Sequence, residues 1–266
     1  MKSVLITGAY GGMGKATAEL LSKQGIMVFS LDKNVSPLNE NIIPVKADIT
    51  DEQSIKEAFL QVKNHTDELF AIIHFAGVYM LDSFMEIDEN DYDKIFDINV
   101  KGAFLINKTF LPLLKNQSRI IITTSELAPL YPLAFTGIYA VTKSALERYA
   151  YSLRMELQLL SIKVSTLRAG AVNTGMLSVS TKALDDFCNK TKLYSFSAKR
   201  FKNIVERVEA RHVSPQKIAK KTVKILNKRN PAFSYSINRN PLLIMLNILP
   251  KRLQFFIIKK ILKKGT

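Results

Sequence analysis

Cysteine is almost absent from this sequence, since Cys188 is its only copy, and tryptophan is missing altogether. A single cysteine cannot form an internal disulfide, so we expect a protein of a reducing compartment, the cytoplasm. No motif surrounds Cys188, and we interpret it as a packing or surface residue. We expect no metal site.

Long apolar runs are also missing. The longest candidate, Leu242 to Leu249, is interrupted by Asn247 and followed by Pro250. A membrane-spanning helix needs roughly 20 apolar residues, so none is expected. The apolar stretch after Met1 and Lys2 is too short for the core of a signal peptide.

Acidic residues are scarce in one part of the chain only. Residues 199–266 hold 18 Lys and Arg against 2 Asp and Glu, whereas the first 198 residues hold 20 against 21. A uniformly basic chain would suggest nucleic acid, and we expect no such partner here. A neutral body with a basic tail indicates an acidic partner that the tail alone meets.

Apolar residues make up 47% of the 266 residues, enough for a sizeable core. Short apolar runs alternate with longer helical patterns. Strands are predicted at Val4–Ile6, Met27–Leu31, Ile42–Lys46, Leu69–Phe75, Arg119–Thr123 and Lys163–Leu167, and helices at Lys15–Gln24, Asp51–Val62, Tyr92–Leu114 and Tyr139–Leu160. Apolar strands separated by helices predict an α/β fold with a doubly wound parallel sheet of the Rossmann type.

No linker divides the chain. We therefore expect a single Rossmann-type domain over residues 1–240, which includes a helical substrate lid over about 175–212. A basic amphipathic segment over 241–266 would extend it.

A glycine-rich turn, Gly8-Ala-Tyr-Gly-Gly12-Met13-Gly14, lies between the first strand and its helix. Glycines there permit a tight turn and let backbone N–H groups approach a pyrophosphate. Asp32 ends the second strand, where its carboxylate can accept hydrogen bonds from a ribose diol and repel a 2′-phosphate.

Two charged residues, Lys33 and Asp48, leave the binding of the cofactor open. No basic residue lies in the glycine turn, which favours NAD(H), but Lys33 can pair with a 2′-phosphate, so NADP(H) stays possible. Asp48 follows the third strand and either caps a helix or contacts adenine.

Tyr139 and Lys143 are spaced i, i+4 at the start of a long helix and so share one helical face. A nearby ammonium favours the phenolate, and we expect Lys143 to lower the pKa of Tyr139 for proton exchange with an alcohol oxygen. Ser125 ends the fifth strand and can bind the same oxygen. Asn99 lies within a predicted helix, where Asn is disfavoured and needs a reason, such as anchoring a proton-relay water.

Together these pieces resemble the short-chain dehydrogenase/reductase family over about residues 3 to 175, with hydroxysteroid- and retinol-type members as the general pattern. The matching pieces, in the family's order, are Thr7-Gly8-xxx-Gly12-x-Gly14, Asp32, Asp48, Ala76-Gly77, Asn99-Val-Lys-Gly102, Ser125, Tyr139-xxx-Lys143 and Gly170-xxx-Thr174.

The resemblance implies hydride transfer between a nicotinamide and a carbinol carbon. It implies that Tyr139 exchanges the proton, that Ser125 polarises the oxygen, that Lys143 also binds the nicotinamide ribose and that Asn99 supports the relay. The cofactor-binding residues that it implies are Gly8, Gly12, Met13, Gly14, Asp32, Asp48, Ile49, Ala76, Gly77, Tyr139, Lys143, Val172 and Thr174.

The sequence departs from the family pattern at three places. His74-Phe-Ala-Gly77 replaces the usual Asn-Asn-Ala-Gly, and we interpret His74 as a packed strand residue. Ala169-Gly170 replaces the usual Pro-Gly. The gap from Ser125 to Tyr139 is one residue longer than the commonest spacing, so Thr124 competes for the role of Ser125.

The segment after Thr174 is rich in apolar residues, as are Pro132, Leu133 and Phe135 before Tyr139. A small apolar alcohol or ketone therefore fits best as substrate. The end of the chain has Ile257 and Ile261 on one helical side and Lys259 and Lys260 on the other, a pattern of an interfacial membrane helix, a dimer contact or a substrate-channel cover.

We therefore expect an NAD(H)-dependent alcohol dehydrogenase or ketone reductase for lipid- or steroid-like substrates, assembled as a homodimer or homotetramer. Peripheral contact with a membrane through the basic tail is possible. Two alternatives stay open: a 3-oxoacyl-thioester reductase, whose basic tail would meet an acidic carrier, and a non-catalytic nucleotide-binding protein.

Overall fold

The computed structural model describes residues 2–37, 41–208 and 212–263, and the side chains of residues 177, 178, 207 and 208 also lie outside the description. The predicted lid over 175–212 and tail over 241–266 therefore each include a short stretch outside the described residues.

The centre of the molecule is a seven-stranded sheet in the order β3-β2-β1-β4-β5-β6-β7, and every neighbouring pair is parallel. The strands are β1 (Ser3–Thr7), β2 (Met27–Asp32), β3 (Ile42–Lys46), β4 (Leu69–His74), β5 (Leu114–Ser125), β6 (Lys163–Ala169) and β7 (Ser234–Ile237). The chain order reverses between β1 and β4, and ligands bind at such a switch point beyond the carboxyl ends of the strands. The predicted Rossmann-type sheet is confirmed.

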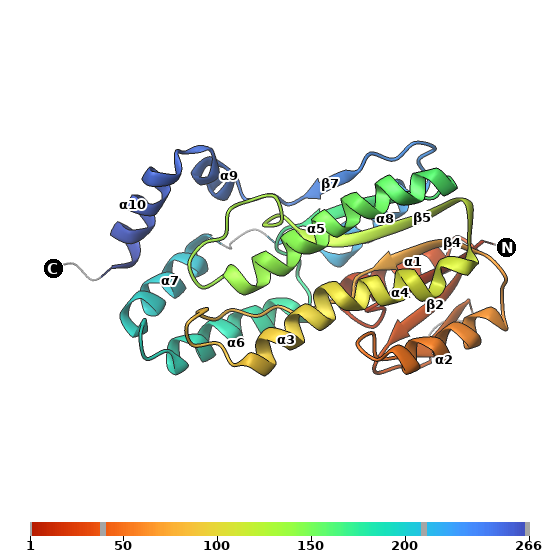
Figure 1. Ribbon diagram of the computed structural model, residues 1–266, viewed down its shortest axis with the longest axis horizontal. Helices are drawn as coiled ribbons and strands as arrows, with labels where there is room; N and C mark the ends of the chain where they lie inside the picture. The colour runs from red at the N-terminus through yellow and green to blue at the C-terminus, as the bar shows by residue number, and fades with distance from the viewer. Residues whose placement is uncertain (1, 38–40, 209–211, 264–266) are drawn as a thin grey trace.

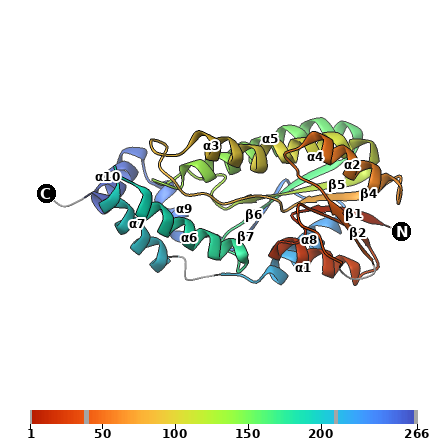
Figure 2. The same ribbon diagram turned by 90° about the horizontal axis from the view of Figure 1, so that it is seen from below.

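Helices cover both faces of the sheet, with α2, α4 and α5 on one and α1 and α8 on the other (Figure 1, Figure 2). The helices are α1 (Gly12–Ser22), α2 (Glu52–Lys63), α3 (Glu89–Phe96), α4 (Gly102–Phe110), α5 (Gly137–Leu157), α6 (Gly175–Lys190), α7 (Ser195–Val208), α8 (Pro215–Leu226), α9 (Pro241–Ile248) and α10 (Lys251–Leu262).

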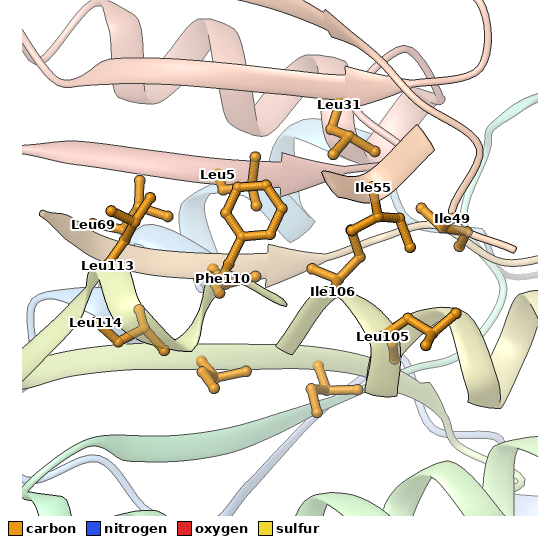
Figure 3. Packing of buried hydrophobic residues seen from close by; sticks show 14 of the residues in the cluster. Leu5, Leu31, Ile49, Ile55, Leu69, Leu105, Ile106, Phe110, Leu113 and Leu114 are labelled. Atoms are coloured by element: carbon orange, nitrogen blue, oxygen red, sulfur yellow. The ribbon is translucent and has the colours of Figure 1, made fainter. Parts of the chain in front are cut away.

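Each covered face has its own apolar core. On the α2–α4–α5 face Phe110 is fully buried among Leu5, Leu69 and Ile106, as Figure 3 shows. On the α1–α8 face, side chains such as Leu21 and Ile218 pack against the strand residues that point away from the first core. Burial on both faces explains why the central strands are continuous apolar runs.

The predicted helix over Tyr92–Leu114 differs from the structure. The chain forms α3, then a single π-helical turn at Asp97–Lys101, then α4, and Leu114 already begins β5. π-Turns are frequent at functional sites, and this one contains Asn99.

A third apolar cluster joins the lid to the tail. Phe187 of α6 and Phe201 of α7 pack around Phe135, and Leu262 of α10 is buried with them. Cys188 packs at the edge of this cluster, in agreement with the packing role predicted for it.

His74 ends β4 in a buried polar contact. The side chain is 4% exposed, its Nε2 lies 2.9 Å from Asn107 Oδ1, and Asn107 Nδ2 donates to the Tyr149 hydroxyl at 3.0 Å. Burial lowers the pKa of His74 from 6.5 to about 4, so the ring is neutral at pH 7. His74 is therefore a packed strand residue, as predicted, and its ring is also hydrogen-bonded.

The low pKa of His74 predicts a pH-dependent stability. Because the unfolded chain binds a proton near pH 6.5 and the folded chain only near pH 4, the free energy of unfolding falls as the pH drops through this window. The shift corresponds to a loss of up to about 3 kcal/mol. We expect His74→Asn to flatten this part of a stability–pH profile measured by urea unfolding. Equal slopes for both proteins between pH 6.5 and 4 would contradict the burial argument.

Candidate active site

A cavity of about 800 Å³ opens at the carboxyl edge of the sheet. Side chains from the ends of β5 and β6, from α5 and from the lid line it. The predicted site residues that line this cavity are Met13, Gly77, Ser125, Tyr139, Lys143, Val172 and Thr174.

Ser125 and Tyr139 meet at the floor of the cavity. Ser125 is the last residue of β5, and Tyr139 lies in the first turn of α5, so the strand end and the helix start bring a hydroxyl to a phenol. The two side chains are hydrogen-bonded. Lys143 follows one turn later, with its Nζ 5.7 Å from the centre of the Tyr139 ring, and is 5% exposed.

The pKa of Tyr139 differs from the sequence-based expectation. Burial raises the pKa of Tyr139 to about 12, against a smaller lowering by the Ser125 hydrogen bond, and burial lowers the pKa of Lys143 to about 8. The Tyr139 phenolate and the Lys143 ammonium would both lose solvent in the cavity wall, and this desolvation outweighs the attraction between the two charges. The net shift of the Tyr139 pKa is therefore opposite to the lowering that the sequence predicted, and Tyr139 is a protonated phenol at neutral pH.

Thr124 does not compete with Ser125. Successive residues of a strand point to opposite faces, and Thr124 Oγ1 donates a 2.7 Å hydrogen bond to Glu147 Oε2 beneath the site. Of the two hydroxyls, only that of Ser125 reaches Tyr139.

Asn99 has a structural partner that the sequence did not reveal. From the π-turn, its Oδ1 accepts the Val78 N–H at 2.8 Å, and its Nδ2 donates to the Val78 carbonyl at 3.0 Å and to Thr142 Oγ1 at 3.1 Å. These bonds fix the segment after β4. A Cβ at Gly77 would lie 3.1 Å from Asn99 Oδ1 and 3.2 Å from Lys143 Nζ, so Asn99 and Lys143 flank the same point of the backbone.

The glycine turn is built for close backbone approach. Gly8 has a φ of +66°, and a Cβ at Gly14 would lie 2.2 Å from the Gly8 carbonyl oxygen. No side chain among the described residues caps the start of α1 at Gly11, and the first N–H groups of a helix have no intrahelical partner. This uncapped helix start fits a pyrophosphate, and Gly8, Gly12, Met13 and Gly14 are the residues that would hold it.

Asp32 stands at the end of β2 beside this turn. Its Oδ2 accepts the Tyr10 N–H at 3.1 Å, and its Oδ1 accepts the Lys33 N–H at 2.8 Å. The Lys33 side chain turns the other way and pairs with Asp48 Oδ2 at 2.7 Å.

Asp48 does not cap a helix, because Asp51 fills that position and accepts the Gln53 N–H. The Asp48 carboxylate is held by the Lys33 ammonium and by both donors of Thr50. Partial burial acts against its charge, but these hydrogen bonds prevail and hold the pKa of Asp48 below its ordinary value.

Three more predicted cofactor residues lie along the same edge. The Ile49 side chain fills the space where a Cβ on Gly102 would stand, and Ala76 N donates to Thr7 Oγ1 at 3.4 Å beside Gly8. Thr174 caps α6 by accepting the Met176 N–H, and its methyl group lies against Gly12. The start of α6 therefore packs directly against the glycine turn.

The sequence did not reveal several cavity residues. The Tyr79 ring lies 4.9 Å from that of Tyr139, and the Glu126 carboxylate lines the cavity while accepting the Asn240 N–H. Side chains from α9 and α10 line the far end: Leu242, Leu243, Leu246, Ile257, Ile258, Ile261 and Leu262. The amphipathic pattern of the tail was the only signal for them.

Residues 2–185 match the family model described as short chain dehydrogenase. A 3-ketodihydrosphingosine reductase of Bacteroides thetaiotaomicron is 28% identical over 234 residues, which are 86% of this chain and 85% of that protein. Estradiol 17-beta-dehydrogenase 2 of Mus musculus is 31% identical over 242 residues, 86% of this chain, but the match covers only 61% of that longer protein.

The fold has solved counterparts as well. A short chain dehydrogenase family protein from Francisella tularensis superposes with a TM-score of 0.75 at 25% identity, over 89% of this chain and 97% of that one. Residues 2–185, which the family model matches, include the glycine turn, Ser125, Tyr139 and Lys143. The chain therefore belongs to the short-chain dehydrogenase/reductase family of oxidoreductases, which bind a nicotinamide cofactor.

Proposed function

We propose that the protein interconverts a secondary alcohol and a ketone on an apolar, lipid- or steroid-like substrate with NAD(H). The observation that supports this most is the hydrogen-bonded Ser125–Tyr139 pair, with Lys143 beside it, at the floor of a cavity whose far end is apolar.

Proton exchange is the task of Tyr139. A bound nicotinamide would supply or take up the hydride. With a pKa of about 12, Tyr139 is protonated at neutral pH and is a donor for the oxygen of a ketone. Ser125 donates to the same oxygen and orients it.

Lys143 supports the proton transfer electrostatically. Its ammonium stabilises a phenolate that forms on Tyr139 during the reaction, although burial keeps its own pKa near 8. Asn99 is a positioning residue, since its bonds to Val78 fix the backbone next to Lys143.

The NAD(H) preference rests on Asp32 and Lys33. A carboxylate at the end of β2 repels a 2′-phosphate, and the one adjacent cation that would attract it is paired with Asp48.

Asp32→Ala should shift cofactor use. Charge-assisted hydrogen bonds to a ribose diol are worth about 1.5–3 kcal/mol, so kcat/KM with NADH should fall about 10- to 100-fold relative to NADPH. Asp48→Asn, which releases Lys33, should raise kcat/KM with NADPH relative to NADH. A wild-type protein that already prefers NADPH would show that Lys33 governs the choice.

The substrate class follows from the cavity lining. Apolar side chains of α7, α9 and α10 face its far end, and the similar proteins include a reductase of a sphingoid ketone and a steroid dehydrogenase by name. A panel of long-chain ketones, ketosteroids and 3-oxoacyl thioesters with NADH and NADPH tests the proposal. The highest kcat/KM is expected for an apolar ketone. A preference for carrier-bound 3-oxoacyl thioesters would favour the rival reductase, and cofactor binding without any turnover would favour a nucleotide-binding protein.

We also propose a homodimer or homotetramer that assembles through α4 and α5. The two helices lie side by side (Figure 1) and expose large apolar side chains, among them Phe104, Tyr151 and Met155. Sedimentation equilibrium checks this, and a monomer at micromolar concentration would contradict it.

A further inference from the structure

The helices α9 and α10 form a hairpin at the end of the molecule far from the N-terminus (Figure 1, Figure 2). Its inner side lines the cavity through residues such as Leu246, Ile257 and Ile258. For Ile257 and Ile261 the sequence left a membrane contact, a dimer contact and a substrate-channel cover open, and the structure turns both toward the cavity. A different set of residues forms the outer side.

The outer side of the hairpin exposes large apolar side chains. Phe255 and Phe256 of α10 are 71% and 61% exposed, and Met245 and Ile248 of α9 are 62% and 78% exposed. Single exposed apolar residues are common on proteins, but four large ones on two successive helices of one hairpin indicate a contact surface. We call these four residues the apolar patch.

Cations surround the apolar patch. Arg252, Lys259 and Lys260 are exposed on the same outer side of α10, because the helical repeat places them between and beside the two phenylalanines, and the exposed Lys263 follows the helix. The sequence contains no Asp or Glu after Glu209. Exposed aromatic residues mixed with lysines and arginines are typical of a helix that lies in a membrane interface, since the long basic side chains reach outward to the headgroups.

A second copy of the chain fits this surface poorly. In a two-fold symmetric dimer the same patch meets itself, so Arg252, Lys259, Lys260 and Lys263 would face four more cations without an acidic partner. An anionic membrane surface complements both the charge and the apolar side chains. No helix in the described part of the chain is long and apolar enough to cross a membrane, so the contact would be peripheral.

We propose that the outer side of the α9–α10 hairpin docks on an anionic membrane surface and that a lipid-like substrate passes between the two helices and α7 into the cavity. This path rests on the function proposed above. It follows from the position of the hairpin, whose outer side meets the headgroups while its inner side already forms the apolar end of the cavity. The substrate's chain would then leave the bilayer without crossing water.

Co-sedimentation of the full chain with phosphatidylcholine vesicles, with and without phosphatidylglycerol, tests the docking surface. Binding is expected only to the anionic vesicles and should weaken with salt. Near an anionic surface each lysine contributes about 1 kcal/mol, so Lys259→Gln/Lys260→Gln should weaken partitioning about 30-fold. Phe255→Ser/Phe256→Ser should weaken it as well. The matched control is Lys220→Gln/Lys224→Gln, which makes the same charge change on exposed positions of α8 and should bind normally.

Measurements of kcat and KM distinguish a failure of this proposal from a failure of the proposed function. None of the substituted residues lines the cavity, so kcat with a water-soluble ketone should stay unchanged in every variant, whereas KM for a ketone dissolved in vesicles should rise in the α10 variants. No binding of the wild type to anionic vesicles at low salt would overturn the proposal, and so would α10 variants that bind normally but change their oligomeric state. Vesicle binding without any turnover would support the docking surface and contradict only the proposed enzymatic function.

Discussion

Tyr139→Phe should lose ketone reduction almost completely and still bind NADH. The substitution removes the hydroxyl that interacts with Ser125 at the cavity floor and leaves the ring in place against Tyr79. General acid–base catalysis contributes about 10²- to 10⁴-fold, so kcat should fall by that factor. NADH binding, measured by fluorescence titration, should change little, because the glycine turn and Asp32 are untouched.

Two further substitutions make the test specific. Ser125→Ala should also lower kcat, since the substrate oxygen loses its second donor, whereas Thr124→Val should leave the chemistry intact because Thr124 is bonded to Glu147. A Tyr139→Phe protein with near-normal kcat would show that another group moves the proton.

The second large effect concerns the support beneath the site. Glu147 of α5 is buried, and its Oε1 accepts from Arg168 Nε at 3.0 Å and from Arg168 Nη2 at 2.7 Å. The hydroxyls of Thr124 and Thr166 also donate to this carboxylate. Removing one partner of a largely buried pair costs about 3–5 kcal/mol, because the remaining charge, here that of Arg168 with its side chain 23% exposed, keeps little solvent and has no counter-ion. We expect Glu147→Ala to lower the free energy of unfolding by this amount in urea denaturation.

An exposed ion pair provides the control for that measurement. Lys101 and Asp97 are 3.3 Å apart at i, i+4, with side chains 55% and 43% exposed, so Asp97→Asn should cost no more than about 0.5 kcal/mol. Glu147→Gln, which keeps an acceptor oxygen for the threonines, should lie between the two. Equal losses for Glu147→Ala and Asp97→Asn would contradict the account of the buried pair.

Local signals were enough to predict most of the sheet. The central strands are mostly buried on both faces and therefore contain apolar runs, whereas the edge strand β3 is only partly buried. The glycine turn and Asp32 mark the ends of β1 and β2. Strand β7 was missed because Ser234–Ile237 is short and half-buried, so it pairs with β6 at the sheet edge without an apolar run of its own. Helix α8 was missed too, although its buried side holds Ile218 and Val223 at helical spacing.

The sequence motifs predicted which residues form the site, but not the burial and contacts of their side chains. Ser125, Tyr139 and Lys143 meet as their spacing indicated, but the pKa of Tyr139 depends on how deeply the cavity buries it, which spacing does not encode. Asn99 needed its partner Val78, which is distant in sequence. Glu126 and the inner side of α9 and α10 depend on how the tail folds back over the sheet edge.

The most direct test of the account follows the hydride itself. The protein is incubated with a long-chain ketone and NADH deuterated on the nicotinamide ring carbon that donates hydride, and the product alcohol is analysed by mass spectrometry. We predict deuterium on the carbinol carbon of the product with wild-type protein and almost none with Tyr139→Phe. Bound NADH with no labelled alcohol from any ketone of the panel would contradict the central claim that this cavity performs hydride transfer.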